Sequence, residues 1–228
     1  MGKNKGILFA ADVLEEDKLI EIISDVSPFI SMIKIGNLLF YEHSFKIIKK
    51  IKDIISIPII ADLKLLDMPN MASRITELAV NNGVDGIIVA GAIGQEGIIA
   101  CQEILRDKYL FVFTQFTHCG GLINDREADE YVKLALHLEC SGVQVPATKK
   151  GRVKQIKEIV GDKLIIISCG IGTQKFYTEE NYGPEIGSAL IDGADYEIIG
   201  RSIYNPKLPI SSPKEAALLA FEKIKNIL

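Results

Sequence analysis

The sequence has no tryptophan, few aromatic residues and few residue clusters suited to holding a metal ion. Aromatic side chains make up 7% of the 228 residues, and there are four cysteines and three histidines. The cysteines form no CxxC pair and the histidines form no HxxxH pair, which argues against both a zinc site and a disulfide framework. We therefore expect no metal and a reducing, cytoplasmic compartment.

Long apolar runs and an excess of one charge are also absent. The first apolar run, residues 7–11, is too short for a signal-peptide core and far below the roughly 20 residues of a membrane span. Lys and Arg total 26 and Asp and Glu total 30, a net charge of −4 that gives no general attraction for nucleic acid or an anionic membrane. We expect neither of these partners, and an anionic ligand would need a local binding site.

Short apolar segments rich in β-branched residues recur along the chain, and each is followed by a longer segment of helical periodicity. The apolar segments are mostly uninterrupted by polar residues, which is typical of parallel strands covered by helices on both faces. We predict eight strands, at residues 6–11, 30–35, 57–61, 86–90, 109–114, 142–145, 163–168 and 196–200. We predict helices near residues 15–26, 38–53, 70–82, 94–106, 125–139, 149–160, 184–192 and 212–227.

Eight repeats of strand and helix predict an α/β fold, a (β/α)8 TIM barrel that forms a single domain over residues 1–228. A doubly wound open sheet is the competing fold. It is less favoured because Asp12-Val13-Leu14-Glu15, and not a glycine-rich dinucleotide turn, follows the first strand. Residues 170–183 form a polar segment after the seventh strand. This segment is longer than most loops, so we interpret it as an irregular loop and a candidate lid.

Ionisable residues lie at or just after the ends of the first three predicted strands, where a TIM barrel places its active site. Asp12 follows the first strand and Lys34 lies in the second. Strand alternation points Asp62 and Lys64 to the same side, toward the barrel mouth, whereas Asp67 falls in the following loop. Each residue alone could be a solvated charge, but as a group they predict a cleft with perturbed pKa values. A lysine held between carboxylates stays protonated and can act as a general acid.

Glycines and an arginine follow the last two predicted strands. Loops at these positions frequently bind phosphate in TIM barrels, through backbone N–H groups and a helix N-terminus. Here they contain Gly170, Gly172 and Gly200, which let the backbone approach an anion, and Arg201, which can add a bidentate contact. We therefore predict a phosphorylated ligand.

Residues 62–70, with the sequence DLKLLDMPN, resemble the DxKxxD motif of the orotidine 5'-monophosphate decarboxylase family, which often continues with an apolar residue and Pro-Asn. The resemblance covers nearly the whole chain, including Asp12 and residues 33–36, 117–120, 170–174 and 193–204. The motif alone is shared with magnesium-dependent hexulose-phosphate synthases and ketogulonate-phosphate decarboxylases. Those relatives usually carry Glu in place of Lys34 and Gly soon after the second Asp, so Lys34 and Pro69 favour the orotidine-phosphate branch.

The resemblance implies a cofactor-free decarboxylation of orotidine 5'-monophosphate to UMP, the last step of pyrimidine synthesis, through a carbanion at C6 of the ring. Asp62 would press against the departing carboxylate and Lys64 would protonate C6. Lys34 and Asp12 would hold the ribose hydroxyls and the charge network.

The resemblance further implies that Asp67 and Met68 reach into the site of a neighbouring subunit, so the active unit would be a homodimer with shared active sites. Thr117 would contact the edge of the pyrimidine. The phosphate would be held by Gln174, Gly200 and Arg201.

A few residues depart from the family pattern. Met71 stands at a substrate-binding position where members commonly have Thr, and its thioether cannot replace the hydroxyl's hydrogen bond. Thr117 replaces the usual Ser, and Cys119 and Cys169 stand where Pro is common. None of these changes removes a charged residue. We therefore expect them to affect substrate affinity more than catalytic activity.

Two alternatives remain. A sugar-phosphate lyase of the same suprafamily would require magnesium. A non-catalytic phosphate-binding barrel would require neither a metal nor the charged residues. The orotidine-phosphate decarboxylase requires the charged residues and no metal.

Overall fold

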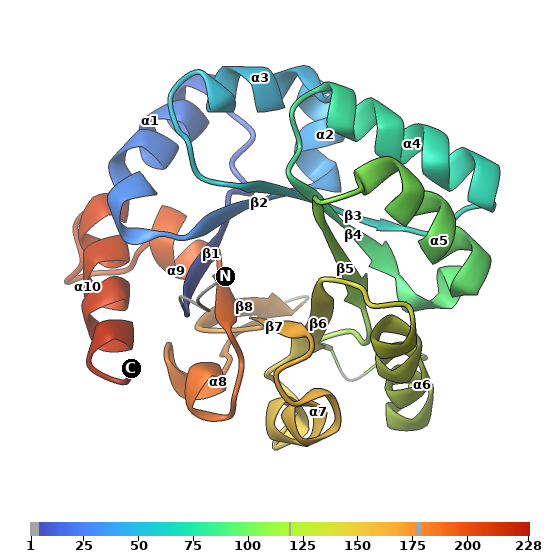
Figure 1. The fold of residues 1–228 in the computed structure, drawn as a ribbon. Coiled ribbons are helices and arrows are strands. Elements are labelled where there is room, and N and C mark those ends of the chain that lie inside the picture. The colour runs from blue at the N-terminus through green and yellow to red at the C-terminus, as the bar shows by residue number, and fades with distance from the viewer. Residues whose placement is uncertain (1–4, 119, 177–178) are drawn as a thin grey trace.

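Residues 5–118, 120–176 and 179–228 are described by a computed structural model, with the backbone alone for residues 173–176 and 179–182. Eight parallel strands close into a barrel in the order β1-β10-β7-β6-β5-β4-β3-β2, and helices surround it (Figure 1). The strands are β1 (Gly6–Ala10), β2 (Met32–Gly36), β3 (Ile59–Leu65), β4 (Gly86–Ala90), β5 (Tyr109–Phe113), β6 (Gly142–Pro146), β7 (Ile165–Cys169) and β10 (Tyr196–Ile199). The predicted TIM barrel is confirmed, and the open sheet is excluded.

Three helices of the outer layer begin where the sequence supplies a start signal. Asn124 and Glu127 form a capping box at the start of α6, and Pro69 and Pro213 occupy the first turns of α4 and α10. The helices are α1 (Glu16–Val26), α2 (Asn37–His43), α3 (Lys46–Lys52), α4 (Pro69–Asn81), α5 (Gly94–Leu105), α6 (Asp125–His137), α7 (Arg152–Val160), α8 (Ser188–Ile191), α9 (Arg201–Tyr204) and α10 (Pro213–Lys225).

Two helix predictions need correction, and one helix was missed. The single helix expected over residues 38–53 is divided into α2 and α3, because Ser44 has a φ of 57° that an α-helix cannot accommodate. The helix expected at residues 184–192 is reduced to the four residues of α8, which follow Gly187 in a left-handed conformation. The short helix α9 was not predicted.

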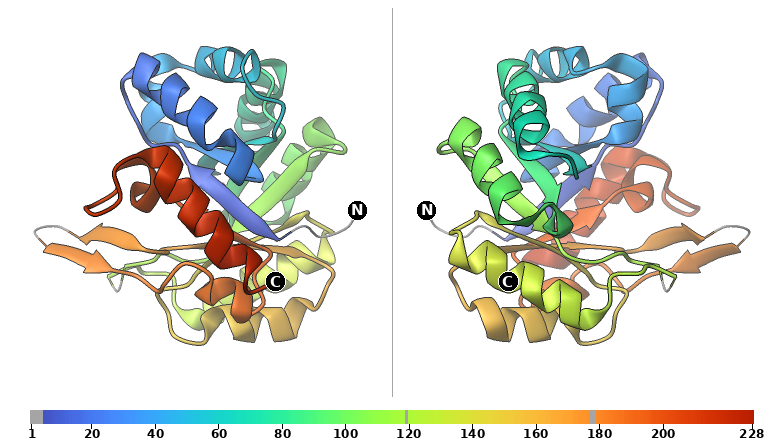
Figure 2. Two further views of the ribbon diagram at one scale, coloured as in Figure 1. Left: turned by 90° about the vertical axis from the view of Figure 1, so that its left-hand side faces the viewer. Right: turned by 90° about the vertical axis from the view of Figure 1, so that its right-hand side faces the viewer.

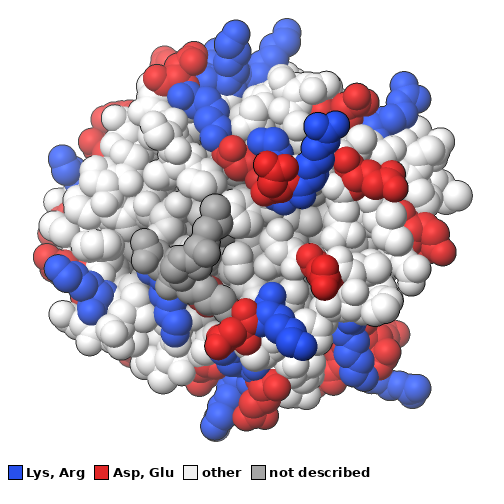
Figure 3. All heavy atoms as spheres, in the orientation of Figure 1, with Lys and Arg blue, Asp and Glu red and all other residues white. Residues whose placement is uncertain are grey.

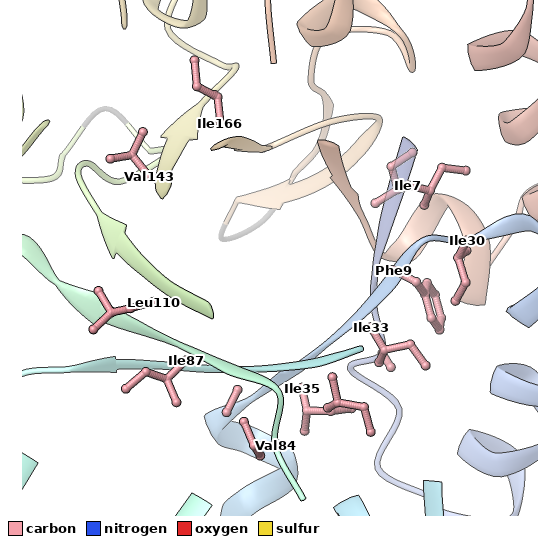
Figure 4. Close-up of a cluster of buried hydrophobic side chains, with 14 of the residues drawn as sticks. Ile7, Phe9, Ile30, Ile33, Ile35, Val84, Ile87, Leu110, Val143 and Ile166 are labelled. Atoms are coloured by element: carbon pink, nitrogen blue, oxygen red, sulfur yellow. The ribbon is translucent and has the colours of Figure 1, made fainter. Parts of the chain in front are cut away.

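Two apolar clusters fill the molecule, one outside and one inside the barrel. The outer cluster packs outward-facing strand residues, such as Ile33 and Val143, against the helices (Figure 4). The inner cluster consists of Leu8, Ala10, Met32, Ile60, Ile88, Phe111, Phe113, Ile167 and Ile198. Strand alternation assigns residues to the two clusters, so a strand covered on both faces reads as uninterrupted apolar sequence.

The segment after β7 is an ordered hairpin and not the irregular loop that the sequence led us to expect. It consists of β8 (Thr173–Phe176) and β9 (Glu179–Tyr182), which pair in antiparallel fashion and project outward from the barrel (Figure 2). At its base Gly183 N donates to Gly172 O at 2.7 Å. A Cβ on Gly183 would lie 2.0 Å from the Gly170 carbonyl oxygen, so only glycine permits this close approach. Closure of the hairpin as a lid stays a prediction.

The surface mixes both signs of charge. Figure 3 shows Lys and Arg interspersed with Asp and Glu over the visible face, without a large region of one sign. No helix in the described part of the chain is long and apolar enough to cross a membrane.

Candidate active site

A cavity of about 220 Å³ lies at the carboxyl ends of the barrel strands. Its walls combine charged and apolar side chains from opposite sides of the barrel. Of the residues that the sequence indicated, those lining it are Asp12, Lys34, Asp62, Lys64, Thr117, Gly170, Gly200 and Arg201. The structure therefore brings together predicted residues from six different strand ends.

A buried ion-pair network forms one wall of the cavity. The Lys64 ammonium contacts both carboxylate oxygens of Asp62, at 2.8 and 2.9 Å, and the Lys34 ammonium lies 3.2 Å from the same carboxylate. Lys34 also lies 3.7 Å from Asp12. The side chains of Lys34 and Asp62 are only 9% and 5% exposed, so this part of the network is shielded from water.

The network maintains the charges of its buried members. Burial opposes ionisation of Asp62, but attraction to Lys34 and Lys64 outweighs it and holds the pKa of the carboxyl below its usual value. Burial likewise opposes protonation of Lys34, but the carboxylates of Asp62 and Asp12 outweigh it and raise the pKa of the ammonium. At neutral pH the cavity therefore presents a carboxylate held between two ammonium groups.

Lys64 reaches Asp62 through an irregularity in β3. The pairing of β3 with β4 shifts register between Ala61 and Leu65, and Lys64 has a φ of 41°, an uncommon value for a residue other than glycine. The ammonium also lies 5.4 Å from the centroid of the Phe113 ring, within the range of a cation–π contact. The sequence correctly predicted that Lys64 and Asp62 share a side, although a bulge contributes as well as simple alternation.

Asp67 does not join this network within its own chain. It is exposed and follows β3, and its Oδ1 accepts a hydrogen bond from the backbone N–H of Met68 at 2.7 Å. Met68 and Met71 are 69% and 39% exposed and do not line the cavity, and neighbouring Leu66 is 62% exposed. These exposed apolar residues are near neighbours of Asp67 in the sequence.

The predicted phosphate-binding elements lie at another part of the rim. Gly200 immediately precedes α9, which begins with Arg201, and both residues line the cavity together with Gly170. Gln174 is on β8, where the structure describes the backbone alone. Cys119 lies outside the described residues. Thr117 is anchored because its carbonyl oxygen accepts a hydrogen bond from Thr148 Oγ1 at 2.7 Å.

Sequence reasoning missed several residues that line the cavity, among them Phe113, Phe116, Gln144 and Tyr204. Strand alternation could have identified Phe113 and Gln144 as inward-facing, but no local motif marks them as functional. Cys169 also lines the cavity, and burial raises the pKa of its thiol to about 11. Among the described residues, no group of three or more His, Cys, Asp or Glu side chains is placed to hold a metal ion.

Several known proteins are similar to this chain in sequence. The sequence profile of the "Orotidine 5'-phosphate decarboxylase / HUMPS family" matches residues 5–216. The chain is 35% identical to the orotidine 5'-phosphate decarboxylase of Methanosarcina acetivorans, over 99% of this chain and 97% of that protein. It is 34% identical to that of Pyrococcus abyssi, over 96% of this chain and 99% of that protein.

Solved structures show the same similarity. A crystal structure of orotidine 5'-phosphate decarboxylase from Pyrococcus horikoshii OT3 superposes with a TM-score of 0.83 at 31% identity, covering 96% of this chain and 99% of that one. The enzyme from Methanocaldococcus jannaschii, complexed with the inhibitor BMP, superposes with a TM-score of 0.85 at 30% identity, covering 96% and 98%.

Proposed function

The chain belongs to the orotidine 5'-phosphate decarboxylase / HUMPS family, and we propose that it converts orotidine 5'-monophosphate to UMP in pyrimidine synthesis, without a cofactor. The observation that carries the proposal is the Asp62 carboxylate, buried and held ionised between Lys34 and Lys64 at the cavity wall. A fixed negative charge beside two ammonium groups suits a reaction in which a substrate carboxylate departs as neutral CO2 and a proton replaces it.

The reaction proceeds in two steps. The substrate carboxylate lies against Asp62, and the repulsion between the two anions raises the energy of the bound substrate. The bond from C6 to the carboxylate carbon breaks, CO2 leaves, and the electron pair stays on C6. Lys64 Nζ then donates its proton to C6 to give UMP, and the lysine regains a proton from solvent.

Lys34 keeps this arrangement in place during turnover. It remains 3.2 Å from Asp62, so Asp62 retains a cationic partner when Lys64 has given up its proton. Preorganised charges of this kind stabilise a developing anion without reorganisation at the moment of reaction. Lys34 and Asp12 also hold the ribose hydroxyls, and Thr117 contacts the edge of the pyrimidine.

Phosphate binding supplies energy remote from the reacting ring. Gly200 and Arg201 at the cavity rim, with Gln174 from β8, hold the 5'-phosphate. Binding energy gained there is used to hold the substrate carboxylate against Asp62, which raises the rate of the chemical step.

The active unit is a homodimer in which Asp67 and Met68 serve the neighbouring subunit's site. Two observations support this. Asp67 is exposed and stands apart from the network of its own chain, and the adjacent surface exposes Leu66, Met68 and Met71. Apolar side chains exposed on a surface are typical of protein contacts. From this position Met71 also contributes to substrate binding.

The reaction takes place in the cytoplasm. Cys101, Cys140 and Cys169 are free thiols, and burial raises the pKa of Cys140 to about 12. Buried thiols of this kind are typical of a reducing compartment.

The magnesium-dependent lyase is less favoured because the Lys34 ammonium beside Asp62 competes with a metal ion for that carboxylate. Turnover of orotidine 5'-monophosphate, followed by the ultraviolet absorbance of the ring with and without EDTA, tests the proposal. We expect equal turnover in both. Turnover that EDTA abolishes would contradict the cofactor-free reaction, and no turnover at all would contradict the proposal and favour the sugar-phosphate lyase or the non-catalytic barrel.

A further inference from the structure

Glu197 is a buried carboxylate that the proposed mechanism does not use. It lies on β10, is 0% exposed, and is paired in register with Ile7 on β1 and Ser168 on β7. The next residue, Ile198, belongs to the apolar cluster inside the barrel, so strand alternation directs Glu197 outward, toward the helices. An apolar side chain would suit this position, because burial opposes the charge of a carboxylate and raises the pKa of Glu197 above its usual value.

Backbone N–H groups of one segment compensate this buried carboxylate. Gly187 N donates to Glu197 Oε2 at 2.7 Å, and Ala189 N donates to Oε1 at 2.9 Å. The backbone of Leu190 adds a further hydrogen bond. Hydrogen bonds to an ionised acceptor are stronger than those between neutral groups. Glu197 therefore ties α8, and the turn before it, to β10.

The tied segment follows directly from the second strand of the β8–β9 hairpin. At the base of the hairpin Gly172 N donates to Pro184 O at 2.9 Å, and Gly183 N donates to Gly172 O at 2.7 Å. The base also touches α9, because a Cβ on Gly172 would lie 2.3 Å from Ser202 Oγ. The position of Pro184 therefore determines how the base of the hairpin meets α9.

Side-chain packing leaves one side of the hairpin base unfilled. A cavity of about 500 Å³ is lined by residues of the base, α9 and α10, among them Gly183 and Ser202. An ion pair joins Glu185 to Lys223 on α10 at 2.8 Å, but the two side chains are 85% and 47% exposed, and exposed pairs contribute little in water. The buried hydrogen bonds to Glu197 therefore contribute more to the position of the base.

We propose that Glu197 is a positioning residue that acts through residues 184–190 to hold the base of the hairpin against α9, and thereby shapes the site for the 5'-phosphate. The proposal rests on the proposed function, because it takes the phosphate to lie at Gly200 and Arg201. Glu197 precedes Gly200 by three residues. The same segment thus supplies one side of the phosphate site directly and orients the other side through this carboxylate.

Binding of UMP, and of uridine, which lacks the phosphate, tests this role. Titration calorimetry measures both with the wild type and with Glu197→Gln. Glutamine keeps the volume of the side chain but has one acceptor oxygen, and its NH2 group places a donor against a backbone N–H group. We expect UMP binding to weaken about tenfold, which corresponds to the net loss of about one hydrogen bond. Uridine binding should stay unchanged, so the ratio of the two affinities falls about tenfold.

Asp195→Asn is the matched control. Asp195 is a similarly buried carboxylate, 2% exposed, and its Oδ2 accepts a hydrogen bond from Ile166 N at 2.8 Å. It lies just before β10, at the opposite end of the strand from Gly200, and its side chain contacts β7 and not the segment after the hairpin. We expect this variant to unfold at a lower temperature while the ratio of UMP to uridine affinity stays unchanged.

An unchanged ratio in Glu197→Gln would overturn the proposed role, as would an equal fall in Asp195→Asn. If Glu197→Gln does not fold, Glu197→Asp, which retains the charge but shortens the side chain by one methylene, gives the same comparison. Turnover by the wild type separates the two proposals. If the wild type converts orotidine 5'-monophosphate and the ratio is unchanged, only the role of Glu197 fails. If it does not convert it, the proposed function fails, and the ratio still decides whether Glu197 shapes a phosphate site.

Discussion

Replacing Lys34 by methionine removes one of the two cations that keep Asp62 ionised. Methionine retains most of the volume of the lysine stem, so the change acts mainly through charge. Removing one partner of a buried ion pair typically costs 3–5 kcal/mol, because it leaves an uncompensated charge. Lys64 still contacts Asp62, so we expect the lower end, about 3 kcal/mol. For a chain of this length that corresponds to a fall in Tm of about 6–12 °C.

The matched control is Lys64→Met. The Lys64 side chain is 36% exposed, compared with 9% for Lys34, and its removal leaves Asp62 paired with the more deeply buried lysine. We expect this variant to lose only about 1 kcal/mol, as is typical of a partly solvated pair. The double variant Lys34→Met with Asp62→Asn should be more stable than Lys34→Met alone, because it no longer buries a carboxylate that has lost one of its two cationic partners.

Stability also depends on pH in a defined direction. The folded-state pKa of Asp62 lies below its usual value, so its stabilising contribution is present above the unfolded value of about 3.9. It is lost as the pH falls through the folded-state pKa. Without Lys34, one of the two cations that lower that pKa is gone, so protonation of Asp62 costs the variant less stability than it costs the wild type. The difference in stability between wild type and Lys34→Met should therefore narrow on acidification.

Thermal and urea unfolding, followed by circular dichroism, measure these differences. The reasoning is refuted if Lys34→Met costs no more than Lys64→Met, or if Asp62→Asn fails to restore stability in the Lys34→Met background. Either result would mean that the buried carboxylate does not depend on Lys34 for its charge.

Three further predictions concern the reaction. Lys64→Ala should abolish turnover while UMP affinity, measured by titration calorimetry, changes only modestly, because proton donation follows binding; a collapsed Tm would instead assign Lys64 a structural role. Mixing inactive Lys64→Ala and Asp67→Ala proteins under subunit exchange should restore activity, since one site of each heterodimer is intact; no recovery, with exchange verified by mass, would place Asp67 in its own subunit's site. Arg201→Ala should lower kcat/KM for the phosphorylated substrate, with a loss of transition-state stabilisation of about 2–3 kcal/mol, and leave the slow reaction of orotidine unchanged. Equal slowing of both reactions would show that Arg201 does not bind the phosphate.

The sequence by itself determined the fold and the location of the site. Period-two and helical patterns are local properties, so uninterrupted apolar runs such as residues 86–90 predict buried parallel strands without reference to the rest of the chain. A TIM barrel gathers the carboxyl ends of its strands at one rim. Residues that end those strands, such as Asp12 and Lys34, are therefore placed near each other by topology alone.

Only the tertiary structure decided which of these residues touch. Asp62 and Lys64 are two positions apart and Asp67 is five from Asp62. The irregularity in β3 adds to strand alternation in bringing Lys64 onto Asp62, whereas the loop leaves Asp67 exposed. The 3.2 Å approach of Lys34 depends on the register between β2 and β3. Pair distances of this kind depend on the positions of both backbones to within about an ångström, which no single segment specifies.

The same reason explains what the sequence did not reveal about Gln144 and the segment after β7. Gln144 is one polar residue in an apolar strand, and only packing against Phe113 and Ile167 shows that it is buried beside the cavity with an unpaired oxygen. The hairpin of β8 and β9 has a polar sequence that resembles a loop. It forms because the glycines at its base allow two backbone segments to approach closely, a contact between residues ten or more positions apart.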